Sequence, residues 1–240
     1  MSNTKESHFM KKLAISLMAA ALCLGAQAEV RLPAIIGSNM VLQQNAEASL
    51  WGWAEAGATV TVRPSWTKHK FTAKADTQGR WRTKVPTTGA GGPYTLTFSD
   101  GSKQKTVLEN ILMGEVWVCS GQSNMEMPVA GYPYQPVEGS VEAIVSAADY
   151  PDIRLFTVPH KYTAEPQDDC ESAWKLSSPQ SVRAFSATAY FFGRELQRRL
   201  KVPVGIVASY YGGTFIECWM SRQALDATKL IPNRATASCP

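Results

Sequence analysis

GEVWVCSGQSNMEMP, residues 114–128, contains the change of pattern on which the predicted fold depends. An apolar, β-favouring run at 116–119 passes abruptly into the small and polar residues 120–124. This change predicts a buried strand that ends in a tight turn. The turn carries Ser123, with Gly121 two residues before it. A serine at such a place is held by the strand, and the backbone N–H groups that follow it can face a developing negative charge.

Two interpretations of this turn stay open from the residues alone. Ser123 is either a catalytic nucleophile or part of an ordinary loop between a strand and a helix. The lipase-type elbow Gly-x-Ser-x-Gly has a second glycine after the serine, and here Met125 takes that place. The spacing by itself therefore favours the ordinary loop.

Downstream of residue 114, strand and helix patterns alternate. Strands are expected at 115–119, 153–158 and 204–208, and helices at about 137–148 and 185–200. The second helix has apolar residues at intervals of three and four, and the last strand is a continuous apolar run, typical of a strand covered on both faces. This order predicts a parallel sheet with right-handed crossovers, the start of a three-layer α/β domain.

Two of these strands end in candidate functional loops. The carboxyl ends of parallel strands share one edge of a sheet, and ligands bind there. The first strand ends near Ser123, and the third ends at Tyr-Tyr-Gly-Gly-Thr, which contains Gly212 and Gly213. Adjacent glycines let the backbone approach a ligand and aim N–H groups at it. Taken alone, the two glycines are more typical of a tight turn.

Residues 29–110 have an all-β character. Alternating runs at 50–53, 59–62, 80–85 and 94–98 are separated by clusters of Gly, Pro and Asp. Strands at this spacing predict a small β-sandwich domain that ends near residue 110, followed by the α/β domain at 111–240.

Trp51 and Trp53 share one face of the first of these strands, because side chains alternate with a period of two. Two tryptophans on one face can form a platform for a sugar ring. They are more often part of a core, and we favour that interpretation.

Residues 1–28 are expected to be a signal peptide. Lys11 and Lys12 precede an apolar run at 13–24, and Ala-Gln-Ala at 26–28 has the small-x-small pattern of a cleavage site. About a dozen apolar residues are too few to span a bilayer. We therefore expect a periplasmic or extracellular protein without a membrane anchor.

Composition limits the partners and cofactors. Cleavage after residue 28 would remove three lysines and one glutamate and lower the formal charge from +4 to +2. This charge is too small to indicate nucleic acid as a partner. The four cysteines outside the expected signal peptide lack the spacing of a zinc site, and no metal or cofactor is expected. Cys119 and Cys218 are expected to pack as small apolar residues, although export allows disulfides. The cysteines outside the leader are Cys119, Cys170, Cys218 and Cys239.

The stretch at 114–128 resembles the first signature block of the sialate O-acetylesterase family, which is part of the SGNH group of serine esterases. The second block of the family resembles VPVGIVASYYGGTFIECW at 202–219. Segments such as LPAIIGSNMVLQQ at 32–44 and FSATAYFFGRELQ at 185–197 are also similar to the family. The resemblance covers roughly residues 30–225.

The resemblance implies an SGNH-hydrolase-like α/β/α domain that removes O-acetyl groups from sialic acid through an acyl-serine intermediate. It assigns the nucleophile to Ser123, and the oxyanion hole to the N–H groups of Ser123 and of Gly212 or Gly213. With the resemblance added, the glycine pair fits an oxyanion hole better than a plain turn. The other candidates would form or support the substrate wall: Gln122, Asn124, Glu217 and Trp219.

Two features of the family are not in residues 1–240: the block Trp-Tyr-Gln-Gly-Glu-Ser-Asn, whose asparagine completes the oxyanion hole, and an Asp-x-x-His segment that supplies the base. We therefore expect an incomplete α/β domain, a fragment or an early-terminated product with the nucleophile but without the base. His160 follows the second expected strand at the same sheet edge and could stand in, but a solvated role is favoured.

Three functional classes stay open. The first is an esterase for O-acetylated sialic acid, and the second is a related esterase for acetylated xylan or another polysaccharide. The third is a non-catalytic carbohydrate-binding fragment, which would use the aromatic residues of the β domain. Export is compatible with all three, and the sequence does not predict the oligomeric state.

Overall fold

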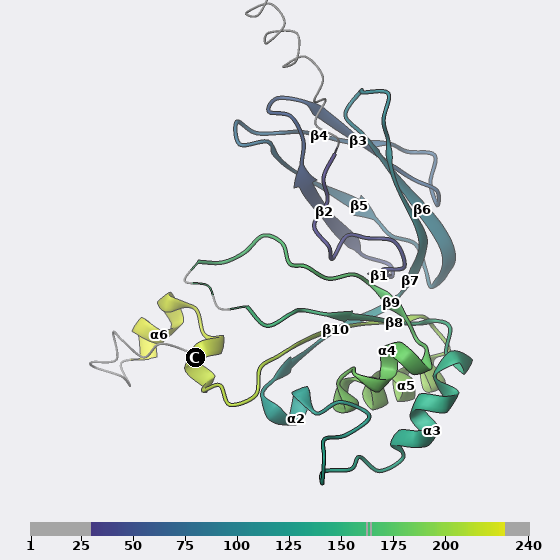
Figure 1. Ribbon diagram of the computed structural model, residues 1–240. Coiled ribbons are helices and arrows are strands. Elements are labelled where there is room, and N and C mark those ends of the chain that lie inside the picture. Colours follow the sequence, from purple (N-terminus) through teal and green to yellow (C-terminus); the bar gives the residue numbers. More distant parts are fainter. Residues whose placement is uncertain (1–29, 162, 164, 229–240) are drawn as a thin grey trace, which may run out of the picture.

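The computed structural model describes residues 30–161, 163 and 165–228 (Figure 1). The expected signal peptide and Cys239 lie outside these residues. None of the helices in the described ranges is long and apolar enough to cross a membrane.

One long strand, β7 (Thr106–Gly121), runs through both parts of the molecule. Its first half pairs with the antiparallel strand β6 (Gly91–Ser99) and the parallel strand β1 (Val41–Gln43). Its second half pairs in parallel with β10 (Val204–Tyr210). The strand expected at 115–119 is thus the end of a longer strand, which crosses the boundary expected near residue 110. The division into two domains stays a prediction.

The N-terminal part consists of strands, as its alternating runs predict. β2 (Glu47–Trp53) and β5 (Arg80–Pro86) form a two-stranded antiparallel sheet. β3 (Thr59–Pro64) pairs with β4 (Phe71–Lys74) and with β6, so these strands extend the large sheet, in the order β4-β3-β6-β7-β10-β8-β9. Residues from both sheets form one core cluster, but the β-sandwich itself stays a prediction.

Trp51 and Trp53 do not lie inside this core. Leu50 is fully buried and Gly52 is also buried, so the two tryptophans face the other way, where both are half-buried. Trp51 packs against the margin of the core cluster. The predicted alternation is present, but the interpretation as core residues is wrong in part, because Leu50 and the buried Trp81 fill the inner face.

The second part contains the parallel strands β7, β10 and β8 (Ile153–Thr157), with β10 in the middle. A short strand, β9 (Lys175–Leu176), extends the sheet in the antiparallel direction. The expected parallel sheet is therefore present. The strands expected at 153–158 and 204–208 agree with β8 and β10 to within two residues at each end, and the strand expected at 115–119 is part of the longer β7. The chain is of the mixed α/β class with a central sheet.

Helices cover one face of this parallel sheet (Figure 1). α3 (Ser140–Val145) continues into a 3-10 turn, and α4 (Pro179–Arg183) precedes the longest helix, α5 (Ala187–Leu200). α5 packs tightly on β10, because a side chain at Gly193 would collide with Ile206. Within the described ranges, residues of the opposite face, including Phe156 and Trp174, pack into the N-terminal core cluster instead. A second helical layer stays a prediction.

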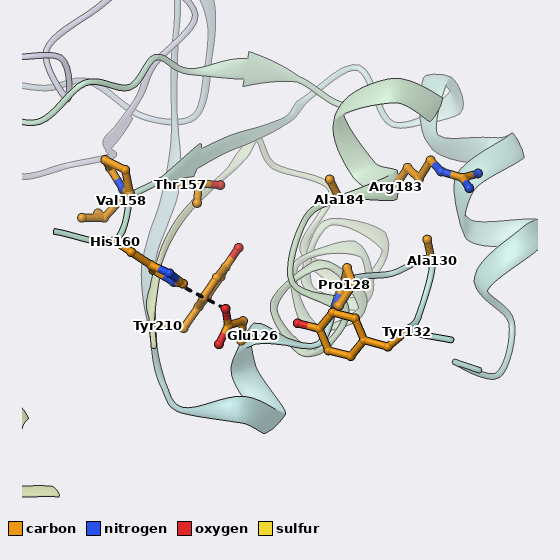
Figure 2. A pocket seen from close by; sticks show the side chains of 11 residues that line it. Glu126, Pro128, Ala130, Tyr132, Thr157, Val158, His160, Arg183, Ala184 and Tyr210 are labelled. Atoms are coloured by element: carbon orange, nitrogen blue, oxygen red, sulfur yellow. Dashed lines mark ion pairs between the residues drawn. The ribbon is translucent and has the colours of Figure 1, made fainter. Parts of the chain in front are cut away.

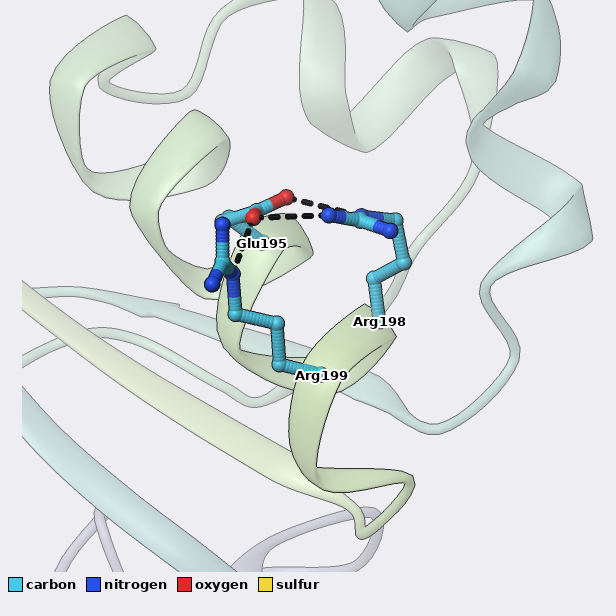
Figure 3. A network of polar contacts seen from close by, with 3 residues as sticks. All are labelled: Glu195, Arg198 and Arg199. Carbon is cyan, nitrogen blue, oxygen red and sulfur yellow. Dashed lines mark hydrogen bonds and ion pairs between the residues drawn. The ribbon is translucent and has the colours of Figure 1, made fainter.

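The outer surface of α5 carries a local network of charges (Figure 3). Arg198 Nε lies 2.8 Å from one carboxylate oxygen of Glu195, and Arg199 pairs with the other. Hydrogen bonds from Arg198 and Arg199 lower the pKa of the Glu195 carboxyl to about 2. All three partners are exposed and lie within four residues of one another.

The three cysteines in the described ranges differ in whether they form a disulfide. Cys119 is a buried free thiol in the core beneath α5, as expected, and burial raises its pKa. Cys170 is a half-buried free thiol. Cys218 is disulfide-bonded, so the expectation that it packs as a simple apolar residue is wrong.

Candidate active site

Ser123 begins the one-turn helix α2 (Ser123–Glu126), directly after β7. The turn forms because the Glu126 and Met127 N–H groups donate to Gln122 and Ser123, and it ends because Pro128 has no N–H to continue it. Ser123 is exposed. In the part of the chain that the structure describes, its hydroxyl has no hydrogen-bond partner.

The second candidate loop meets the first at the end of β10. Tyr210 is paired with Gly121 of β7, and the Tyr211 N–H donates to the Gly121 carbonyl at 3.0 Å. Gly212 then lies against α2, because a Cβ added to it would be only 3.6 Å from Ser123 Cα. The two loops predicted to share a sheet edge are therefore neighbours. Their catalytic roles stay predictions.

Glu126 joins these two loops, and sequence reasoning missed it. One carboxylate oxygen accepts the Gly212 N–H at 2.5 Å, and the other lies 3.5 Å from His160 Nε2 (Figure 2). A signal was available, because Glu126 is three residues after Ser123 and three residues is nearly one helical turn. Its long-range partner Gly212 was not visible in the sequence.

The hydrogen bond to Glu126 distinguishes the two glycines whose N–H groups are candidate donors to an oxyanion. The Gly212 N–H is occupied by the carboxylate. The Gly213 N–H has no acceptor among the described residues, and Gly213 is exposed with φ +76°. Of the pair, Gly213 is therefore the donor available to a ligand. A side chain at this positive φ would strain the turn.

His160 is exposed, as the sequence favoured, but it also has contacts in the site. It follows β8, and its ring lies against that of Tyr211 with 4.1 Å between the centroids and 44° between the ring planes, while its Nε2 faces Glu126. Its side chain keeps 37% exposure. Neither His160 nor His69, the two histidines in the described ranges, has a hydrogen bond to Ser123.

The remaining candidates divide into supporting and exposed residues. Gln122 Nε2 donates to the Thr214 carbonyl at 3.1 Å, and Trp219 Nε1 donates to Thr214 Oγ1 at 2.9 Å. Both side chains thereby hold the buried Thr214 and the loop around it. Asn124 is exposed, and Glu217 is half-buried in the 3-10 turn η2 (Ile216–Trp219).

A cavity of about 550 Å³ opens beside Glu126 (Figure 2). Its wall includes His160 and Tyr210 on one side and Tyr132 and Arg183 on the other. Burial raises the pKa of the Tyr210 phenol, which keeps it protonated as a hydrogen-bond donor. Tyr132 and Arg183 lie in segments without a usable pattern, so the sequence did not indicate them. In the described ranges, no group of three side chains is placed to bind a metal ion.

Comparison with known proteins identifies relatives. The chain is 33% identical over 219 residues to a sialate O-acetylesterase of Mus musculus, which covers 85% of this chain and 39% of the relative. It is 32% identical over 237 residues to the Rattus norvegicus sialate O-acetylesterase, covering 92% of this chain and 43% of the relative. No protein-family model matches.

A solved structure gives the same result. The crystal structure of a novel carbohydrate acetylesterase from Xanthomonas citri superposes with a TM-score of 0.75 and 34% sequence identity. The match covers 83% of this chain and 44% of that one. The chain is a relative of the sialate O-acetylesterases. It spans about two fifths of the length of the curated sialate O-acetylesterases that it matches, and the predicted resemblance is confirmed over that part.

Proposed function

We propose that this chain carries the nucleophile and part of the oxyanion hole of a carbohydrate esterase that removes O-acetyl groups from sialic acid. The observation that carries this proposal is the contact between the Ser123 turn and the Gly212–Gly213 turn at one edge of the sheet. The named activities of the relatives support a sugar O-acetyl group as the substrate.

In the proposed reaction, Ser123 Oγ attacks the carbonyl carbon of the acetyl group and gives its proton to a base. The carbonyl oxygen becomes an oxyanion that accepts hydrogen bonds from the N–H groups of Ser123 and Gly213. The bond to the sugar oxygen then breaks, and the sugar leaves as an alcohol after taking up the proton. Water attacks the acyl-serine, and acetate leaves while the serine hydroxyl is restored.

Glu126 is proposed to keep this arrangement in place. Its bond to the Gly212 N–H holds the glycine turn against α2, and this leaves the Gly213 N–H to the oxyanion. A carboxylate near an oxyanion is unfavourable by itself, because like charges repel. The nearby His160 reduces this repulsion whenever its ring is protonated.

The cavity beside Glu126 is proposed to hold the sugar. Its volume of about 550 Å³ lies within the range of small-molecule sites. Arg183 also lines the cavity, but its guanidinium points away from the other lining residues in Figure 2. The choice of sialic acid over a neutral xylan chain is therefore supported by the named activity of the relatives.

Covalent labelling tests the nucleophile directly. A fluorophosphonate should label Ser123, located by peptide mass spectrometry, and Ser123→Ala should remove both the label and any acetate release from O-acetylated sialic acid. Ser120→Ala is the matched control and should be labelled like the original chain. Labelling at Ser120, or acetate release that survives Ser123→Ala, would overturn the proposal. Release from acetylated xylan at an equal rate would reject the sialic acid assignment alone.

A further inference from the structure

A second cavity, of about 290 Å³, lies on the outward face of the sheet formed by β2 and β5. The lining residues include Trp51 and Trp53 of β2, Arg82 of β5, and Asp168 from the connection between β8 and β9. None of the proposed catalytic residues lines it. The wall thus combines aromatic rings with groups of both charges.

Trp51 and Arg82 form the centre of this wall. They are paired across the two strands, and the Arg82 guanidinium lies 5.9 Å from the centre of the Trp51 ring. Trp53 is less available, because the Arg31 guanidinium lies 3.6 Å over its ring. The Trp51 ring is therefore the less closely covered of the two aromatic surfaces.

The charged groups beside Trp51 still have hydrogen-bonding capacity. Within the described ranges, Arg82 and Asp168 have neither a hydrogen bond nor an ion pair through their side chains. Arg80 and Asp76, which also line the cavity, pair with each other at 3.1 Å. The signs of charge are balanced, so the wall does not select an anion or a cation. A ligand with several hydroxyl groups suits such a wall, because each hydroxyl both donates and accepts.

The loop that carries Asp168 is fixed to the N-terminal part. The neighbouring Asp169 accepts the Ala34 N–H at 2.8 Å and lies 3.4 Å from Arg31. Asp168 is therefore held at the cavity by its neighbour and does not depend on a ligand to bring it there.

From these contacts we infer that the cavity is a second carbohydrate site, which binds one neutral sugar ring of a glycan. The apolar face of the ring would stack on Trp51, while Arg82 and Asp168 would bind its hydroxyl groups. A volume of about 290 Å³ is at the lower limit for small-molecule sites and matches a single ring better than a longer oligosaccharide. This site is separate from the proposed esterase function and does not depend on Ser123.

Titration of the full chain with lactose, followed by the NMR signals of the tryptophan indole N–H groups, tests this inference. We expect a saturable shift of the Trp51 signal. Trp51→Ala should weaken binding at least about tenfold, by analogy with the loss of affinity when a nucleobase loses the aromatic side chain on which it stacks. Arg82→Ala should weaken it several-fold. Thermal unfolding of both variants should show that they are folded, and Trp51→Phe should retain part of the binding.

Two controls separate this site from others. Trp66→Ala removes a tryptophan of the same part of the molecule that does not line the cavity, and it should leave binding unchanged. Ser123→Ala should also bind normally, so failure of the esterase proposal would not affect the result. Absence of saturable binding, or unchanged binding by folded Trp51→Ala, would overturn the inference. A preference for sialyllactose over lactose that Arg82→Ala abolishes would overturn the assignment to a neutral sugar.

Discussion

Two carboxylates in this molecule have similar numbers of partners but belong to different regions. Glu126, the last residue of α2, contacts Gly212 and His160, which lie far from it in the sequence. Glu195, on the outer surface of α5, has polar contacts among the described residues only with Arg198 and Arg199 of its own helix. The contacts of Glu126 fix two loops relative to each other. The contacts of Glu195 stabilise a helix that forms without them. The number of polar contacts is therefore a poor guide to importance, and the elements that they connect are a better one.

The largest effect is expected at the turn that Glu126 holds. Gly213→Val should slow the labelling of Ser123 and any acetate release by roughly 10²-fold to 10³-fold, the usual cost of losing an oxyanion donor. The reason is that Gly213 has φ +76° and presents the available N–H. Labelling rates measured by mass spectrometry would test this. An unchanged rate would place the oxyanion hole elsewhere.

Removal of the Glu126 carboxylate should have the next largest effect. Glu126→Ala should reduce the labelling rate by about tenfold to a hundredfold, because misplacement of a catalytic group by about 1 Å has costs of this order. Glu126→Gln keeps an acceptor for the Gly212 N–H and should retain most of the rate. The Gly212 amide signal in NMR should shift strongly in the alanine variant only. Equal behaviour of the two variants would contradict a positioning role.

His160 should matter less than Glu126. Its pair with Glu126 is partly exposed, and such pairs typically contribute about 0.2–1 kcal/mol. His160→Ala should therefore change the labelling rate by no more than about fivefold. We also expect little turnover in the unchanged chain, because no described residue contacts the Ser123 hydroxyl as a base. Robust turnover that His160→Ala abolishes would identify His160 as that base.

The smallest effect is expected at Glu195. Its pKa in the folded protein is about 2, below the usual value of 4.5, so its stabilising contribution is present above pH 4.5 and is lost as the pH falls towards 2. Glu195→Gln should remove only this contribution, and exposure to solvent keeps it small. Thermal unfolding at pH 7 and pH 3 should show a slightly lower melting temperature for the variant at pH 7 and a smaller difference at pH 3. A difference that grows at pH 3 would contradict this assignment.

Sequence patterns predicted the parts of this molecule that depend on local periodicity. The parallel strands and the long helix α5 are present because their apolar spacing requires burial on a sheet. The meeting of Ser123 with Gly212 followed from the rule that parallel strands end at one edge. The helix expected at 137–148 is shorter, and Gly139 before it has a left-handed conformation.

The features that the sequence did not reveal depend on contacts between distant segments. Nothing near Glu126 indicates that it accepts the Gly212 N–H, and nothing near Asp168 indicates that it reaches the face of β2. The outward position of Trp51 was missed for a related reason. Alternation shows which residues share a face, but the choice of the inner face depends on what the rest of the chain packs against it.

The continuous course of β7 has a consequence for how the protein would handle a long glycan. The strand passes from the N-terminal part into the parallel sheet without a linker, so in the described part of the chain it joins the two parts directly and opposes their rotation. The cavity on β2 and the serine at the end of β7 would then keep a constant separation. A glycan bound at both places would have to match that separation. Binding at both places would therefore depend on the length of the glycan.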